Sequence, residues 1–211
     1  MTGRFLMLLM PLVFVGTVCC AAERCPAPSD SMLGAIVRVE GADAEGSGVV
    51  VRHNLIATAA HVIEDLDQVD VQINGSRRHA EVVSVYPNHD LALLTADTGR
   101  LDPLKLRLSA LRLEEPVWAV GYPRGGPKRA SEGRYEGMTG DDLQTTASVD
   151  HGQSGGALIS CENGEHVLAG IITAFGALDM GDYYVRLDDY SVSVPVDYLA
   201  VMIPVDSLPR D

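Results

Sequence analysis

The chain has 211 residues, of which 46% are hydrophobic and 21% are charged, and its formal net charge is -13. This length and apolar content suit one compact folded unit and leave too little sequence for several independent domains. The acidic excess disfavours attraction to nucleic-acid phosphates or anionic lipid, so nucleic acid is not an expected partner. A folded enzyme or a binding module remains.

The first 22 residues have the features of a secretory signal peptide. Arg4 is the only charged residue before Glu23, and residues 5–18 form an apolar run too short to favour a membrane span. Small residues at 21 and 22 suit cleavage before Glu23. We therefore expect a periplasmic or secreted mature chain, residues 23–211.

The four cysteines allow two further modifications. Lipoprotein processing at Cys19 or Cys20 is the alternative to a soluble exported form, and it would leave a lipid anchor. If cleavage follows Ala22, only Cys25 and Cys161 remain. An even pair in an oxidising compartment favours a disulfide, and the alternative is two unrelated small apolar residues.

The mature chain alternates short β-branched runs with turn residues, which is typical of an all-β protein. The expected strands, in chain order, are 35–40, 49–61, 69–73, 79–86, 91–96, 116–123, 144–149, 156–160, 166–175, 183–187 and 191–196.

A segment rich in Leu and charge, residues 101–115, divides the strands into two groups. We therefore expect two antiparallel β subdomains, at about 31–100 and 115–205. Helical spacing occurs only at residues 196–203, where Asp197 is a candidate N-cap after Pro195.

Three short segments each place a polar side chain in an apolar or glycine-rich neighbourhood, and they contain His61, Asp90 and Ser154. A serine hydroxyl is a weak nucleophile at neutral pH, so it needs an imidazole to take its proton and a carboxylate to hold the imidazole's tautomer. Each residue alone also fits an ordinary loop or turn. Their order in a β-rich chain is that of the chymotrypsin-type double barrel, which predicts a catalytic triad.

The glycines around Ser154 have a chemical reason of their own. Acyl transfer develops an oxyanion, and backbone N–H groups can bind it only where the chain turns sharply at the nucleophile. Gly152, Gly155 and Gly156 permit such a turn. We assign the oxyanion hole to the amides of Gly152 and Ser154.

The chain resembles the trypsin-like serine proteases and, within them, the catalytic domains of the bacterial HtrA type. The resemblance covers residues 31–203 and implies two six-stranded β-barrels with a short C-terminal helix. It also implies hydrolysis of protein or peptide substrates through an acyl-enzyme, without a cofactor. The matching stretches are GSGVVV (46–51), TAAHV (58–62), HDLALL (89–94), VGYP (120–123), QTTASVDHGQSGGAL (144–158), AGIIT (169–173) and VPVDYL (194–199).

The sequence departs from the pattern of the proteins it resembles in three places. Gln153 stands where pancreatic-type enzymes carry an Asp that pairs with a new N-terminus, so activation by that ion pair is not expected. The chain stops at Asp211, so degradation gated by a PDZ domain is not expected either. Asp150 and His151 replace an Asn-Pro pair and are interpreted as turn residues, with tuning of the site as the alternative.

The resemblance also locates the pocket for the side chain that precedes the cleaved bond. Ser148 stands where trypsin-type enzymes carry an Asp for basic side chains, and the wall strand is Thr173, Ala174 and Phe175. A buried basic side chain would find no carboxylate there. If Phe175 shortens the pocket, small or medium apolar residues are preferred; if it points away, the pocket is deep.

Two other classes of function compete with a protease. The sequence GQSGG at residues 152–156 also fits the nucleophile elbow of an esterase, but that fold needs a catalytic His after the Ser, and only His166 follows. The second alternative is a catalytically silent barrel that binds a partner. Such a protein would not need to keep the triad residues, whereas this chain has all three. No metal is implied, since neither HExxH nor CxxC spacing occurs.

Overall fold

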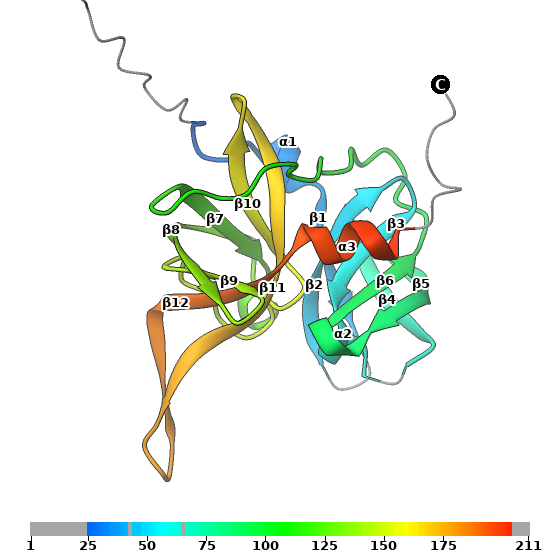
Figure 1. The fold of residues 1–211 in the computed structure, drawn as a ribbon. Coiled ribbons are helices and arrows are strands. Elements are labelled where there is room, and N and C mark those ends of the chain that lie inside the picture. The colour runs from blue at the N-terminus through cyan, green and yellow to red at the C-terminus, as the bar shows by residue number, and fades with distance from the viewer. Residues whose placement is uncertain (1–24, 42–43, 65, 204–211) are drawn as a thin grey trace, which may run out of the picture.

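The computed structural model describes residues 25–41, 44–64 and 66–203, and their strands form two closed six-stranded antiparallel β-barrels (Figure 1). This confirms the all-β double barrel expected from the sequence. The expected signal peptide and the cysteines at 19 and 20 lie outside the described residues. Within the described ranges no helix is long and apolar enough to cross a membrane.

The strands of the first barrel pair in the order β1-β2-β3-β6-β5-β4, and β4 closes the barrel on β1. Burial alternates along β4, as a strand with one inward face requires. By contrast, every residue of β3 is buried. The bounds are β1 Ile36–Glu40, β2 Glu45–Arg52, β3 Leu55–Ala59, β4 Gln68–Ile73, β5 Ser76–Tyr86 and β6 Leu91–Thr95.

The strands of the second barrel pair in the order β10-β11-β12-β9-β8-β7, and β7 closes the barrel on β10. The two expected strands at 183–187 and 191–196 are one continuous strand. The bounds are β7 Pro116–Gly121, β8 Arg129–Thr139, β9 Asp142–Thr145, β10 Ala157–Glu162, β11 Glu165–Asp179 and β12 Tyr184–Pro195.

Strand β8 is absent from the sequence-based prediction. Tyr135 is its only buried residue, and charged side chains occupy much of the strand. An apolar alternation is therefore missing. Backbone pairing with β7 and β9 holds this segment extended.

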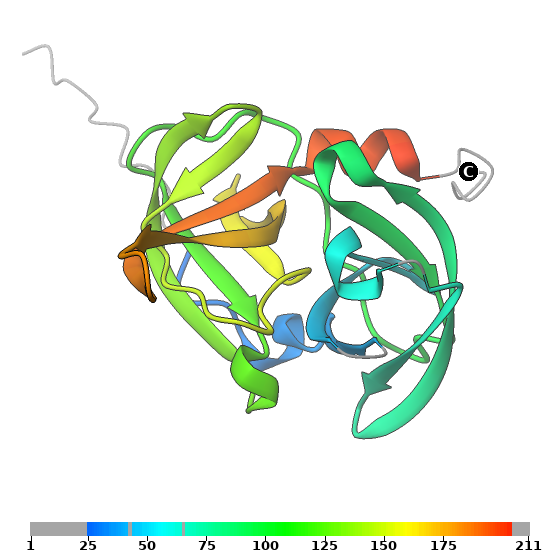
Figure 2. The ribbon, with the colours of Figure 1, turned by 90° about the horizontal axis from the view of Figure 1, so that it is seen from below.

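The helical segments are short: α1 Asp30–Leu33, α2 Ala60–Ile63, η1 Pro87–His89, η2 Pro123–Gly125 and α3 Val196–Met202. Helix α3 leaves the second barrel and lies against the first (Figure 1, Figure 2). Its Val196 and Leu199 are buried in the core cluster that contains most of the first barrel. The N-cap is Pro195, so the expectation for Asp197 was wrong: Asp197 lies in the first turn.

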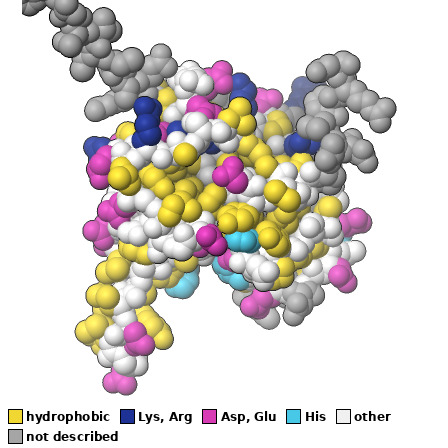
Figure 3. Space-filling view, in the orientation of Figure 1, with side chains coloured by type: hydrophobic (Ala, Val, Ile, Leu, Met, Phe, Trp, Pro, Cys, Tyr) yellow, Lys and Arg dark blue, Asp and Glu magenta, His cyan; other side chains and the backbone are white. Residues whose placement is uncertain are grey.

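Strands β11 and β12 continue beyond the second barrel as a long hairpin. In Figure 1 the hairpin projects away from both barrels, and Figure 3 shows apolar side chains along it. Leu178, Met180 and Tyr184 are exposed there.

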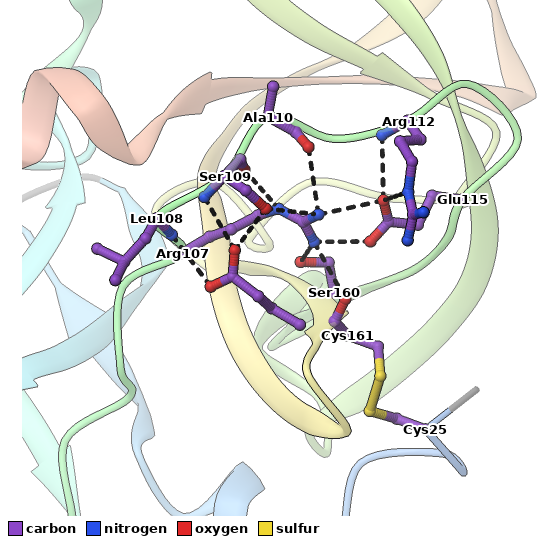
Figure 4. Close-up of polar contacts among 10 residues, drawn as sticks. Cys25, Arg107, Leu108, Ser109, Ala110, Arg112, Glu115, Ser160 and Cys161 are labelled. Carbon is purple, nitrogen blue, oxygen red and sulfur yellow. Dashed lines mark hydrogen bonds and ion pairs between the residues drawn. A yellow bond between two sulfur atoms is a disulfide. The ribbon is translucent and has the colours of Figure 1, made fainter. Parts of the chain in front are cut away.

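The buried side chain of Arg107 fixes the segment between the barrels to β10 (Figure 4). Arg107 Nη1 lies 2.6 Å from Glu115 Oε1 and donates to Ser160 Oγ at 2.8 Å. Beside it, Cys161 forms a disulfide with Cys25, which confirms the predicted pairing. The N-terminal and interbarrel segments are thus both attached to one strand.

Candidate active site

Strand pairing in the first barrel brings His61 and Asp90 together. Strand β3 ends at Ala59 and β6 begins at Leu91, and these two residues are register partners. His61 follows in α2, which Val62 and Ile63 anchor in the core. The two side chains thus meet although 29 positions separate them in the sequence.

The carboxylate of Asp90 holds His61 at two points. Asp90 Oδ2 lies 2.7 Å from His61 Nδ1, and Asp90 Oδ1 accepts the His61 backbone N–H at 2.9 Å. This hydrogen bond raises the pKa of His61 above its ordinary value of 6.5, while partial burial opposes the rise. With Nδ1 so engaged, Nε2 is the nitrogen left to exchange a proton with a nucleophile.

The nucleophile loop, residues 150–156, leads into β10 and packs against the first barrel. Gly155 has φ +80°, and a Cβ built there would lie 2.1 Å from Ser47 O and 2.3 Å from Thr58 Oγ1. Only glycine fits so close an approach. Its N–H donates to Ile172 O at 2.7 Å, which fixes the loop to β11.

Ser154 lies at the centre of this loop and is half-buried. Its hydroxyl donates to Thr173 O at 3.5 Å, a long and weak contact. The described contacts include no hydrogen bond between Ser154 and His61. Of the two hydrogen bonds expected within the triad, the described residues therefore contain the one between His61 and Asp90 and lack the one between Ser154 and His61.

The two amides assigned to the oxyanion hole carry no hydrogen bond among the described contacts, whereas their neighbours are engaged. Gln153 N–H donates to Asp150 O at 3.1 Å, and Gly155 N–H donates to β11. Gly152 adopts φ +85°, and a Cβ there would lie 2.5 Å from Tyr122 O. The N–H groups of Gly152 and Ser154 are therefore free to bind an anionic oxygen.

Ser47 of β2 is a residue that sequence reasoning missed. It is fully buried, and its Oγ donates to Gly152 O at 2.8 Å and accepts from Tyr122 N–H at 2.9 Å. Its N–H donates to Ser154 O at 2.8 Å. The only signal in the sequence is its place in the GSG stretch, which the resemblance includes without a role.

The expected pocket residues lie on both sides of the nucleophile loop. Ser148 precedes the loop and is half-buried, and Thr173 and Ala174 continue β11 beside Ser154. Phe175 packs on the small cluster of Ala119, Ala147, Val149 and Ile172, and its ring meets the His151 ring edge-on at 4.9 Å. Phe175 is thus directed toward the segment that contains Ser148.

Asp150 fixes the start of the nucleophile loop. One of its oxygens accepts the N–H of His151 at 2.8 Å, as a turn residue does. The other lies 2.7 Å from Arg124 Nε. No cluster of His, Cys, Asp or Glu in the described part of the chain could hold a metal ion.

Fold and site together define a trypsin-like domain, and the comparisons agree. The family model described as a trypsin-like peptidase domain matches residues 46–171. The chain belongs to this family.

Among curated proteins, the periplasmic serine endoprotease DegP of Salmonella typhimurium is 33% identical over 151 residues, which is 65% of this chain and 31% of that protein. The serine protease Rv3671c of Mycobacterium tuberculosis is 32% identical over 63% of this chain and 36% of its own length. The chain spans about a third of the length of these relatives.

Among solved structures, the HtrA-type protease AlgW with a tripeptide matches with a TM-score of 0.71 and 26% identity, over 82% of this chain and 60% of that chain. The serine endoprotease from Yersinia pestis matches with a TM-score of 0.68 and 26% identity, over 84% of this chain and 66% of that chain. The chain is therefore similar to HtrA-type catalytic domains.

Proposed function

We propose that this chain is a serine endopeptidase that cleaves peptide bonds through an acyl-enzyme. One observation carries the proposal. The loop that contains Ser154 and two free amides packs against the barrel that contains the His61–Asp90 pair. Nucleophile, base and orienting carboxylate are the three groups that this chemistry requires.

In the proposed mechanism, neutral His61 takes the proton of Ser154 Oγ through Nε2 as the oxygen attacks the carbonyl carbon. Asp90 stabilises the imidazolium that forms, and the amides of Gly152 and Ser154 bind the developing oxyanion. His61 then donates its proton to the leaving amine. A water molecule, activated by the same imidazole, hydrolyses the acyl-enzyme. The hydrogen bond between Ser154 and His61 must form on substrate binding, as catalytic hydrogen bonds often tighten at that step.

The nucleophile loop needs no newly cleaved N-terminus in this proposal. Gln153 is buried, and its Oε1 accepts the N–H of Asp150 at 2.9 Å. The backbone N–H of Gln153 donates to the backbone carbonyl oxygen of Asp150 at 3.1 Å. These two bonds close the turn before Ser154 without a buried charge, which supports a loop whose conformation does not depend on a newly cleaved N-terminus.

The pocket should accept small or medium apolar side chains such as Ala, Val or Leu. The support is the position of Phe175, packed toward residues 147–149 and beside His151. A ring there shortens the space available to a substrate side chain, and Ser148 offers no charge to a basic one.

We further propose that the mature protein, residues 23–211, acts in the periplasm or outside the cell after removal of residues 1–22. The Cys25–Cys161 disulfide supports this, because disulfides persist in oxidising compartments.

The test is cleavage of casein and of a mixed peptide library by the purified mature chain. Ser154→Ala and His61→Ala should each lower turnover by several orders of magnitude, and Asp90→Asn should also be severe. Ser131→Ala, a matched change on β8, should leave turnover intact. Wild-type turnover by Ser154→Ala would refute the proposal and favour a silent barrel that binds a partner.

A further inference from the structure

The residue before Asp90 contacts two tyrosine rings. The His89 ring stacks on the ring of Tyr198 in α3, with the ring centroids 3.7 Å apart and an angle of 23° between the planes. It also meets the ring of Tyr86, at the end of β5, at 4.8 Å and 45°. This aromatic cluster joins the segment that carries Asp90 to the helix at the end of the described chain.

The single turn η1, which leads into Asp90, has little other side-chain packing. None of its three residues is buried in the core. Pro87 and Asn88 are exposed, and only His89 is half-buried. The stack on Tyr198 is therefore the closest side-chain contact that holds this turn against the rest of the molecule.

The backbone of Asp90 depends on the position of this turn. Asp90 ends η1 with φ 49° and ψ 42°, in the left-handed region that is unfavourable for a residue with a Cβ. Its N–H donates to Pro87 O at 3.1 Å, and its carbonyl oxygen accepts the N–H of Ala60 at 3.0 Å. If η1 shifts, the backbone of Asp90 can relax, and its carboxylate then moves away from His61 Nδ1.

Tyr198 is itself held firmly by its helix. The neighbouring Leu199 is fully buried, and Tyr198 and Met202 both pack against the same core cluster. The hydroxyl of Tyr198 has no hydrogen bond among the described residues, so the ring alone makes the contact with His89. A fixed ring on α3 thus supports the turn that carries Asp90.

We propose that Tyr198 is a positioning residue for catalysis. By stacking on His89 it holds η1 in place, and through η1 it holds the Asp90 carboxylate against His61. This inference rests on the proposed function, because the position of Asp90 affects turnover only if His61 is the base. It adds α3 to the parts of the molecule on which the His61–Asp90 pair depends.

Four other carboxylates interact electrostatically with residues of this region. They are Asp141 and Asp142 where β8 turns into β9, Asp197 of α3, and Glu64 at the end of α2. The substitutions proposed below leave all four in place. A change in the pKa of His61 in these variants therefore reports a change in its contact with Asp90.

The first test is steady-state cleavage of a peptide substrate by variants of α3. Tyr198→Ala should lower kcat by about tenfold to a hundredfold, because a small displacement of a catalytic group is enough for such a loss. KM should change little, since α3 contributes no residue to the proposed pocket. Tyr198→Phe keeps the ring and should keep kcat.

The matched control is Met202→Ala. Met202 is half-buried on the same helix and packs against the same core cluster, but it takes no part in the aromatic cluster. This variant loses packing of α3 and should keep kcat. Equal kcat values in Tyr198→Ala and Met202→Ala would overturn the inference.

The route through His89 is tested by a double-mutant cycle. His89→Ala should lower kcat about as much as Tyr198→Ala does. Combining the two substitutions should cause no further loss, because both remove the same contact. Losses that multiply in the double variant would show that Tyr198 acts independently of His89 and would overturn the inference.

Titration of His61 by NMR separates this inference from the proposed function, because it needs no turnover. The measurement is made on the Ser154→Ala chain, and the His61 signal is assigned by its loss in His61→Ala. The contact with Asp90 raises the pKa of His61, so Tyr198→Ala should lower this pKa. Tyr198→Leu, which keeps apolar volume without a ring, should lower it as well.

Tyr198→Phe and Met202→Ala should leave the pKa of His61 unchanged. This pattern would support the positioning role even if no peptide were cleaved. An unchanged pKa of His61 in both variants without a ring would overturn the inference, even if Ser154 proved essential for cleavage.

Discussion

The hydroxyl of Ser47 donates a hydrogen bond to the carbonyl oxygen of Gly152 at 2.8 Å, and this bond joins the first barrel to the nucleophile loop of the second. It fixes the peptide unit between Gly152 and Gln153, which lies between the two amides assigned to the oxyanion hole. The N–H of Ser47 holds Ser154 O at 2.8 Å as well. Ser47 is therefore a positioning residue for the proposed oxyanion hole.

Ser47→Ala should lower kcat by about tenfold to a hundredfold, because a misplaced oxyanion hole loses stabilisation in the transition state. KM should change little, since Ser47 is fully buried and lies outside the proposed pocket. Steady-state kinetics on a peptide substrate measure both quantities.

The matched control for Ser47 is Thr98→Val. Thr98 is also fully buried, and its hydroxyl accepts a backbone N–H from Asn54 at 3.0 Å, at the end of β3 away from His61. Each variant removes a hydroxyl that accepts one backbone N–H and donates to one oxygen, so the two variants should lower the free energy of unfolding by comparable amounts. Equal kcat values in the two variants would contradict a positioning role for Ser47.

The rate of cleavage should rise with pH through the titration of His61. Only neutral His61 can accept the serine proton, and Asp90 raises the pKa of His61 above 6.5, so the rising limb should lie above that value. In the residual activity of Asp90→Asn the limb should move to lower pH, because the charge that stabilises the imidazolium is lost. A profile that is flat from acid to neutral pH would count against His61 as the base.

Phe175→Ala should widen the range of accepted side chains before the cleaved bond. The ratio of kcat/KM for Phe over Ala at that substrate position should rise by about tenfold or more, because the ring no longer fills the pocket. Phe175→Leu should give an intermediate ratio. Peptides varied only at that position measure the ratio, and a wild type that already prefers Phe or Tyr would show that Phe175 lies outside the pocket.

Glu115→Ala should destabilise the fold by about 3 to 5 kcal/mol, because it leaves the Arg107 charge buried and unpaired. The side chains of Arg107 and Glu115 are only 5% and 8% exposed. The exposed Lys105–Glu165 pair provides the control, and Glu165→Ala should cost less than about 1 kcal/mol. Urea unfolding measures both, and similar losses in the two variants would contradict this account of the buried pair.

Much of the fold was predictable because its strands carry a local signal. β4 and β6 are short apolar or alternating runs with turn residues on both sides, and both occur where expected. β8 has no such signal, since its conformation comes from pairing with its neighbours. The single strand expected at 49–61 was wrong for a similar reason. It is divided by a turn at 53–54 between β2 and β3, and the chain enters α2 at Ala60, where two buried residues anchor a single helical turn.

The candidate site likewise contains residues that could be predicted from the sequence and one that could not. His61, Asp90 and Ser154 could be selected from the sequence because their chemistry requires those residue types in that order. Ser47 could not, because its importance arises from a contact across 105 positions of sequence with a backbone carbonyl. Every residue has a backbone carbonyl, so residue types do not indicate which carbonyl accepts a hydrogen bond.

The most direct test of the central claim is the reaction of the mature chain with a fluorophosphonate, measured by intact mass and peptide mapping. An activated serine is modified, whereas an ordinary one is inert. We predict a single adduct on Ser154 in the wild type, a greatly slowed reaction in His61→Ala and no adduct in Ser154→Ala. A wild type that stays unmodified, or that is modified at a different serine, would contradict the assignment of Ser154 as the nucleophile.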